Sequence, residues 1–332
     1  MSVRNRAAGL ALAAFGSILM GSTAMAADFN MRIHTLVQSP HPYNDMAAFI
    51  KEQLEARSDG RIEIRIFDSG QLGQDPAVIS EVGLGTIDMM ISTTSNAAQQ
   101  VPEFSIFTMP YLFTDMDNLL ERVGPGTPVH EHFETVYEER GIGMKLLALG
   151  GSGARSMSTR EVAVEEPADL EGLRMRTPPS PMDSETWSAF GMLPVTVAWG
   201  ELYAAMQTGI ADALESSLPG YAGSKLYEVA PNLALTEHVI QVNHTSMSTV
   251  SWDKLPEDLQ ALVQEVAEEA NVHGLEKAKE YDAELVESLQ SEHDVTVTRP
   301  DKEALMAVAE PIQAKLAADL DLVAEFELMR QD

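Results

Sequence analysis

The sequence predicts an α/β protein with two domains and one unusually long helix. Its 332 residues are enough for two domains of roughly 100–200 residues each. In the first hundred residues, apolar runs typical of strands alternate with segments of helical spacing, which is the α/β pattern. Late in the chain, residues 257–292 contain no proline and keep the 3.6-residue period of an amphipathic helix.

The N-terminal part predicts strand, helix, strand, helix and strand in that order. Ile62, Ile64 and Ile66 alternate with polar residues, as in a half-buried strand. Asp75 is interpreted as the N-cap of a helix whose first turn holds Pro76. The last strand is apolar throughout, as expected for a parallel sheet that is covered on both faces. The expected elements are strand 31–37, helix 44–57, strand 61–67, helix 75–85 and strand 87–91.

The middle of the chain continues in the same style. The glycine-rich run 150–153 is interpreted as a flexible connection after strand 144–149, which places Arg155 close to the end of an apolar strand. The expected elements are strands 144–149, 173–176, 194–197 and 212–215, and helices 182–190 and 199–207.

The expected helix 257–292 would be about 54 Å long at about 1.5 Å per residue, longer than one small domain is wide. We therefore expect it to contact both lobes. The alternative is two helices broken near Gly274. Strand 294–298 and the helical stretch 301–329, with Pro311 as a kink or a start, suggest that the chain returns to a lobe it left earlier.

Residues 1–26 have the pattern of a secretory signal. Arg4 and Arg6 form a positive start, an apolar stretch follows from about 8 to 20, and Ala24-Met25-Ala26 fits the cleavage rule. The apolar stretch is shorter than the roughly 20 residues of a membrane span, although an uncleaved anchor is the alternative. We expect cleavage near Ala26, no membrane insertion of the mature chain, and a location in a bacterial periplasm.

The charge is strongly negative, with 22 Lys and Arg against 51 Asp and Glu and a formal net charge of −29. Nucleic acids and anionic lipid surfaces are bound by basic residues, so neither is an expected partner. The acidity suggests a salt-loving source, and the alternative is the ordinary acidity of exported proteins. The absence of cysteine excludes disulfides, thiolate metal sites and cysteine nucleophiles.

Catalytic motifs are scarce. Gly151-Ser152-Gly153 has the wrong glycine offset for a nucleophile elbow. His130 and His132 would lie about 200° apart around a helix, which is a poor arrangement for chelating a metal. We therefore expect no enzyme activity, no metal and no cofactor, and keep a secreted hydrolase only as a remote alternative.

Two arginines stand out instead. Arg176 lies in an apolar strand, where a charge is costly unless it is paired or functional, and Arg155 follows another apolar strand. In open α/β sheets, ligands bind beyond the carboxyl ends of the strands. A guanidinium there can hold a carboxylate with two parallel charge-assisted hydrogen bonds. The alternative for both arginines is a structural ion pair with one of the many acids.

Seven short segments carry a family resemblance, in order along residues 31 to 265. The chain resembles the solute-binding proteins of tripartite ATP-independent periplasmic (TRAP) transporters, the DctP-like family. Each segment is weakly specific alone, but the set is highly specific. The segments are GRIEI (60–64), GQLG (70–73), MPYLF (109–113), DLEGLRMR (169–176), WGELYAAMQTG (199–209), ADALE (211–215) and KLYEV (225–229).

The resemblance implies the two-lobed periplasmic-binding-protein (Venus-flytrap) fold, in which crossing strands and a long helix join the lobes. Lobe I is expected to comprise 27–152 plus about 242–281, and lobe II 153–241 plus about 282–332. The ligand would lie in the cleft between the lobes, and hinge closure would surround it. The protein is expected to be a monomer that performs no chemistry on the ligand and delivers it to the TRAP membrane permease subunits.

The resemblance also implies site residues. Arg176 matches the arginine that clamps the ligand carboxylate, and Arg155 matches a second arginine that helps in many members. Where many members have the pattern D-G-x-E-N, this chain has D-A-L-E-S at 212–216. The hydroxyl of Ser216 therefore replaces the usual amide after Glu215. The remaining matches are His41 and Thr93 as contacts from the first lobe, and Trp199 and Tyr221 as pocket walls, with core packing as the alternative.

The expected ligand is a small organic acid, either a monocarboxylate or a sugar acid. Because Ser216 replaces the amide, and because Asp183, Glu201 and Glu215 are expected near the cleft, a small amine or a polyol is the alternative.

Overall fold

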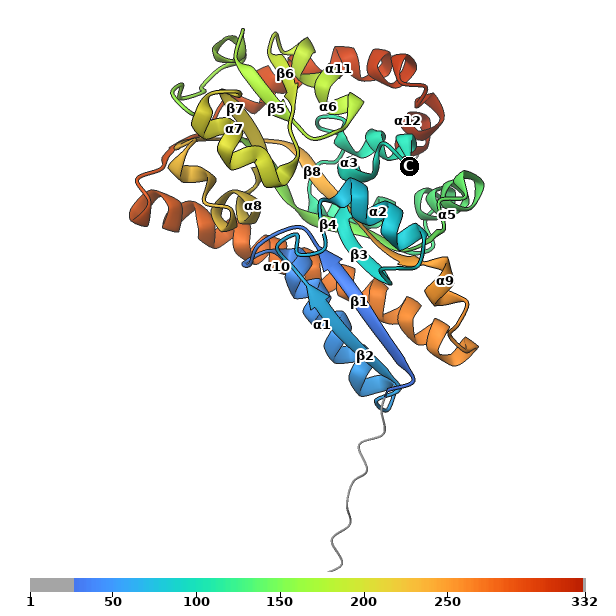
Figure 1. Cartoon of the computed structure of the whole chain (residues 1–332). Helices are drawn as coiled ribbons and strands as arrows, with labels where there is room; N and C mark the ends of the chain where they lie inside the picture. Colours follow the sequence, from blue (N-terminus) through green and yellow to red (C-terminus); the bar gives the residue numbers. More distant parts are fainter. Residues whose placement is uncertain (1–26, 331–332) are drawn as a thin grey trace, which may run out of the picture.

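The computed structural model describes residues 27–330 (Figure 1). The predicted signal 1–26 and its cleavage site near Ala26 lie outside the described residues. Within 27–330, no helix combines the length and the apolar character that crossing a membrane requires.

One half of the molecule is built on three parallel strands, as the alternating pattern predicted. Ile33 of the central strand lies beside Ile66 on one side and Met89 on the other. The apolar faces of these strands pack against the first helix of the chain. The elements are β1 (Phe29–Thr35), α1 (Pro42–Arg57), β2 (Ile62–Phe67), α2 (Asp75–Gly83), β3 (Met89–Thr93), α3 (Thr94–Ala97), η1 (Pro102–Thr108), α4 (Met116–Val123) and α5 (Pro128–Arg140).

The other half has its own small parallel set, in which β5 lies between β6 and β7. Trp187 and Met175 belong to one apolar cluster of this half, and Leu214 and Leu226 belong to another. The elements are η2 (Pro167–Leu170), β5 (Arg174–Thr177), α6 (Pro181–Ala189), β6 (Leu193–Thr196), η3 (Trp199–Glu201), α7 (Leu202–Thr208), β7 (Ala213–Ser217), α8 (Leu218–Gly223) and η4 (Leu226–Glu228).

Two long antiparallel strands join the halves into one sheet of order β2-β1-β3-β8-β4-β7-β5-β6. β8 (Asn232–Ser248) pairs with β3 near its C-terminal end, whereas β4 (Met144–Thr159) pairs with β7 near its own C-terminal end. Between these regions the β4–β8 register shifts at Gly151/Ala154 and again at Arg155/Met157. The result is the predicted two-lobed α/β fold, with the lobes connected through strands that cross between them (Figure 1).

The prediction of a flexible connection at 150–153 was wrong, because this glycine-rich run lies inside β4. A Cβ atom added to Gly150 would lie 2.4 Å from Oδ1 of Asn271, and one added to Gly151 would lie 2.7 Å from Cδ1 of Leu275. Both neighbours belong to the long helix α10. The glycines at 150 and 151 therefore allow that helix to approach the strand closely.

The helix α10 (Glu257–Glu292) runs unbroken for 36 residues, so the predicted single helix is confirmed. Gly274 causes no break, since a Cβ there would lie 2.5 Å from Sδ of Met46 in α1. The first part of α10 packs in the cluster that contains α1, whereas Leu289 packs in the cluster that contains α8. The helix therefore contacts both lobes.

The C-terminal elements are α9 (Thr249–Trp252), β9 (Thr296–Thr298), α11 (Lys302–Asp319, with Pro311 inside it) and α12 (Val323–Met329). β9 pairs with β8 as a late strand that returns to an earlier part of the sheet. Leu305 of α11 packs in the cluster of Trp187, whereas Phe326 of α12 packs in the cluster of Phe133. The two ends of 302–329 therefore contact different lobes. The residue boundaries of the lobes stay a prediction.

Candidate ligand-binding site

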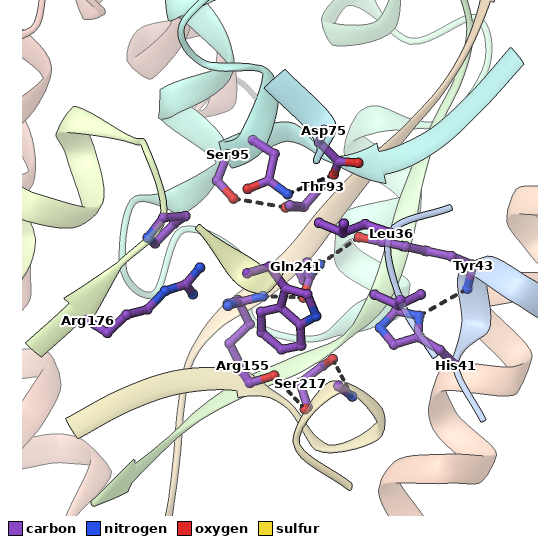
Figure 2. A pocket seen from close by; sticks show the side chains of 16 residues that line it. Leu36, His41, Tyr43, Asp75, Thr93, Ser95, Arg155, Arg176, Ser217 and Gln241 are labelled. Carbon is purple, nitrogen blue, oxygen red and sulfur yellow. Dashed lines mark hydrogen bonds between the residues drawn. The ribbon is translucent and has the colours of Figure 1, made fainter. Parts of the chain in front are cut away.

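A cavity lies between the lobes, beside the crossing strands (Figure 2). Its walls bring together residues that are far apart in the sequence. The predicted site residues that line it are His41, Thr93, Arg155, Arg176, Trp199 and Ser216. The lining residues that sequence reasoning did not assign to the site are Leu36, Val37, Tyr43, Asp75, Ser95, Asn96, Pro178, Ser217, Gly220 and Gln241.

Arg155 is held by the protein itself. Its Nε and Nη2 atoms donate to the two carboxylate oxygens of Glu215, and Nη1 donates to the side-chain oxygen of Gln241. Burial alone would raise the pKa of Glu215, but the charge of Arg155, together with His238, outweighs burial and holds this pKa well below its usual range. Arg155 and Glu215 therefore form a buried ion pair in the wall of the cavity.

Arg176 is in the opposite situation. Its side chain comes from β5 and is 1% exposed, and its Nε donates to the carbonyl oxygen of Val197 at 2.9 Å. Within residues 27–330, neither terminal nitrogen of this guanidinium has a hydrogen-bond acceptor. The guanidinium carbon lies 5.7 Å from the ring centroid of Trp199, and the side chain extends toward the space bounded by Gln241 and Arg155 (Figure 2).

Burial lowers the pKa of Arg176 to about 10, since removal from water disfavours the charged form. The nearby charge of Arg155 lowers the pKa further, while Glu215 and Asp183 act in the opposite direction. Arg176 is therefore still protonated at neutral pH, and it is a buried cation without a carboxylate bound to it.

The first-lobe wall supplies neutral polar groups. Nδ1 of His41 accepts the Tyr43 backbone N–H at 3.2 Å and caps α1, so the ring proton is on Nε2. Burial, helped by the charge of Arg155, lowers the pKa of His41 to about 3, so this imidazole is neutral. The Tyr43 hydroxyl oxygen accepts from the amide of Gln241 at 2.6 Å, and burial raises the pKa of Tyr43 to about 12.

Asp75 is buried and does not cap its helix, so the predicted N-cap role was wrong. The helix begins at Asp75 itself, and the carboxylate accepts hydrogen bonds from His34 at 3.0 Å, from Asn96 at 2.8 Å, and from Ser92. This network satisfies the carboxylate from within the first lobe, because a buried carboxylate needs several donors.

Ser216 and Ser217 end β7 at the cavity. The Ser216 hydroxyl donates to the Ser217 carbonyl at 3.0 Å, and the Ser217 hydroxyl accepts the Gly220 N–H that caps α8. A Cβ on Gly220 would lie 2.7 Å from the Ser216 hydroxyl and 3.2 Å from the indole of Trp199. The glycine therefore leaves room for both neighbours in this wall.

Two predicted site residues do not line the cavity. Glu215 is not in the lining and accepts hydrogen bonds from Arg155, which is. Tyr221 is buried in the core, where its hydroxyl donates to the Ala230 carbonyl at 2.7 Å. Of the acids expected near the cleft, Glu201 is exposed and Asp183 is buried outside the lining, where burial and the charge of Glu215 raise the pKa of Asp183 to about 6.

The residues that were missed gave little signal. Gln241 lies on β8, a strand that was not predicted because its sequence mixes polar and apolar residues without a clear period. Asp75 was interpreted only as the N-cap of a helix, and Tyr43, just before the expected helix 44–57, was given no role. Their positions carried a signal, however. A tyrosine and an aspartate that begin two neighbouring helices can meet at the edge of a parallel sheet, where ligands bind.

A cavity between two lobes, lined by side chains from both of them, is the arrangement of a binding protein for a small molecule. The model of the bacterial extracellular solute-binding protein family 7, DctP, matches residues 33–319. The chain therefore belongs to this family, the solute-binding proteins of TRAP transporters.

Similarity to other solute-binding proteins supports the assignment to this family. The ectoine-binding periplasmic protein TeaA from Halomonas elongata is 30% identical over 303 residues, which cover 91% of this chain and 87% of TeaA. A TRAP periplasmic solute-binding protein from Polaromonas, solved bound to D-erythronate, has a TM-score of 0.84 and 25% identity over 91% of this chain and 98% of its own. Another from Bradyrhizobium, in complex with D-galacturonate, has a TM-score of 0.82 and 27% identity over 91% of this chain and 100% of its own.

Proposed function

We propose that this protein is the extracytoplasmic solute-binding subunit of a TRAP transporter that captures a small organic acid, a monocarboxylate or sugar acid. The acid occupies the cavity between the lobes, Arg176 clamps its carboxylate, and the lobes close around it. The closed form then delivers the acid to the membrane permease subunits. The protein acts in the periplasm, performs no chemistry on the acid, and works as a monomer.

The observation that carries this proposal is the free end of the Arg176 guanidinium. A buried charge without a hydrogen-bonded partner is costly, and a carboxylate that binds both terminal nitrogens removes that cost. The planar fork of arginine matches a carboxylate in geometry as well as in charge. A ligand carboxylate is thus the group that completes this site.

The other walls support a ligand with hydroxyl groups and a single negative charge. Arg155 is already neutralised by Glu215, so it leaves no second unpaired cation for a dicarboxylate. The first lobe and β8 present neutral donors and acceptors, which suit hydroxyl groups, from Thr93, Ser95, Asn96 and Gln241. The related proteins bound to D-erythronate and D-galacturonate hold acids of this kind.

No observation favours the amine alternative. Glu215 is bound by Arg155, Glu201 is exposed outside the lining, and Asp75 is bound by three donors from its own lobe. An ammonium group in the cavity would therefore lie near the unpaired charge of Arg176 and have no free carboxylate to balance it.

Pairs of solutes that differ only in the carboxylate test the proposal. Thermal unfolding is followed with D-galacturonate against D-galactose, D-erythronate against erythritol, and D-galactosamine as the amine. A ligand at 100 times its Kd stabilises the folded protein by about 2.7 kcal/mol, which is readily seen as a rise in Tm. We expect an acid to raise Tm while its neutral partner does not. Stabilisation by the neutral sugar or the amine alone would overturn the carboxylate assignment.

A further inference from the structure

A single side chain bridges the two lobes beside the cavity. Gln74 stands at the N-cap position of α2 but makes no capping hydrogen bond with its side chain. Its Oε1 atom instead accepts the backbone N–H of Gly200, in η3 of the other lobe, at 3.0 Å. The residues next to this contact, Asp75 on one side and Trp199 on the other, both line the cavity.

The contact also lies at the boundary of a second, wider hollow. This outer groove is lined in part by Gln74, Gly200, Leu36 and Trp199. Leu36 and Trp199 line the cavity as well, so they form the partition between the cavity and the groove. The Gln74–Gly200 hydrogen bond therefore fastens the lobes at the point where the cavity meets the outer groove.

The glycine at position 200 fits this contact closely. A Cβ atom there would lie 2.6 Å from Nε2 and 3.1 Å from Oε1 of Gln74. A similar close approach occurs along the same groove, where a Cβ on Gly223 would lie 3.2 Å from the carbonyl oxygen of Gln38. The two lobes thus meet through glycine backbone on the second lobe, and a side chain at position 200 would displace the Gln74 amide.

We propose that Gln74 is a positioning residue that latches the closed form, with its side-chain carbonyl holding the Gly200 N–H and so keeping Trp199 over Arg176. The inference rests on the proposed function, because a latch matters only if the lobes open and close around a solute. Gln74 does not contact the solute, and it changes affinity by changing the stability of the closed form. By the usual strength of a neutral hydrogen bond, its loss weakens solute binding about two- to tenfold.

The experiment uses the whole mature chain with two added cysteines that carry spin labels. The sequence has no cysteine of its own, so Leu84→Cys beside α2 and Leu193→Cys in β6, both exposed, label one site on each lobe. D-galacturonate and D-erythronate are the probes, and the label-to-label distance is measured against their concentration. Gln71→Ala is the matched control, because the Gln71 amide bonds only to Asp68 in its own lobe.

We expect Gln74→Ala and Gly200→Ala each to need about two- to tenfold more probe for half closure, whereas Gln71→Ala matches the wild type. The double variant should be no weaker than either single variant, because the added Cβ has nothing to displace once the Gln74 side chain is gone. Closure of Gln74→Ala at the wild-type concentration, or additive losses in the double variant, would overturn the latch.

A failure of the proposed function looks different. If neither probe changes the label distance or Tm of the wild type, the acid proposal fails. The latch is then tested by comparing the label-to-label distances of the wild type and the variants without solute. Gln74→Ala must then show longer distances than wild type and Gln71→Ala. The same distance distribution in all three proteins would overturn the latch as well.

Discussion

The two arginines of the cavity are the same residue type in opposite electrostatic surroundings. Burial alone would lower the pKa of Arg155, but the charge and hydrogen bonds of Glu215 outweigh burial and raise it. Arg176 lacks such a partner, and burial lowers its pKa to about 10. The protein thus completes the bonding of one guanidinium itself, whereas the terminal nitrogens of the other have no acceptor among residues 27–330.

The difference follows from where each arginine lies in the sheet. Arg155 is on β4, whose antiparallel partner β7 carries Glu215 only two residues from the position paired with Arg155. Arg176 is on β5, and its Nε is bound by the Val197 carbonyl that follows β6. The first arginine therefore belongs to the joint between the lobes, whereas the second extends from one lobe into the cavity.

The largest expected effect is on folding, through Arg155→Met. This change leaves the Glu215 carboxylate buried without its partner, and breaking a buried pair in this way costs about 3–5 kcal/mol. The free energy of unfolding, measured by urea denaturation at pH 7, should fall by that amount. Most of the loss should return in Arg155→Met combined with Glu215→Leu, since neither charge of this pair then remains without its partner.

Arg174→Met is the control for this comparison. Arg174 is exposed on β5 and pairs with Asp212 at 2.6 Å, and exposed pairs contribute little to stability. A variant Arg155→Met that is as stable as Arg174→Met would contradict the assignment of Arg155 to the fold.

The next effect is on binding, through Arg176→Met. Truncating one partner of a buried charge pair costs about 2–5 kcal/mol, so affinity for the acid that binds the wild type should fall by that amount in calorimetry. The unliganded variant should be at least as stable as wild type, because the change removes an unpaired buried charge. A large loss of stability with unchanged affinity would mean that Arg176 serves the fold, as Arg155 does, and does not bind the acid.

Much of this site was predictable from the sequence. An arginine in an apolar strand must be paired or functional, and that rule drew attention to Arg176, although Arg174 stands in the same strand. Arg155 was selected by its place after an apolar strand and by the family resemblance, with a structural ion pair as the alternative, but nothing in the sequence identified Glu215, sixty residues away, as the acid that binds it. That pairing depends on the register of β4 against β7, which only the folded sheet defines.

The glycines show the same limit. The run at Gly150 and Gly151 has the composition of a flexible loop, yet it is a strand beneath α10. A glycine can allow a bend or allow a close approach, and the sequence alone does not distinguish them. Gly200 is a second example, since its role depends on a glutamine from the other lobe.

The smallest effect concerns the first-lobe wall and its dependence on pH. The folded pKa of His41, about 3, is far below the ordinary 6.5, so between these values the unfolded chain takes up a proton that the folded chain does not. The stability that the neutral His41 contributes is therefore fully present above pH 6.5. It falls as the pH is lowered, by up to about 1.4 kcal/mol per pH unit.

The variant His41→Asn tests this dependence, because it keeps an oxygen that can cap α1 but has no imidazole to protonate. In urea denaturation at several pH values, it should lose the His41 part of the slope, which amounts to about 1–2 kcal/mol at pH 5. Equal slopes in His41→Asn and wild type would contradict this prediction. They would mean that the imidazole becomes protonated in the folded protein, although it lies close to two arginines whose combined charge is only half balanced by Glu215.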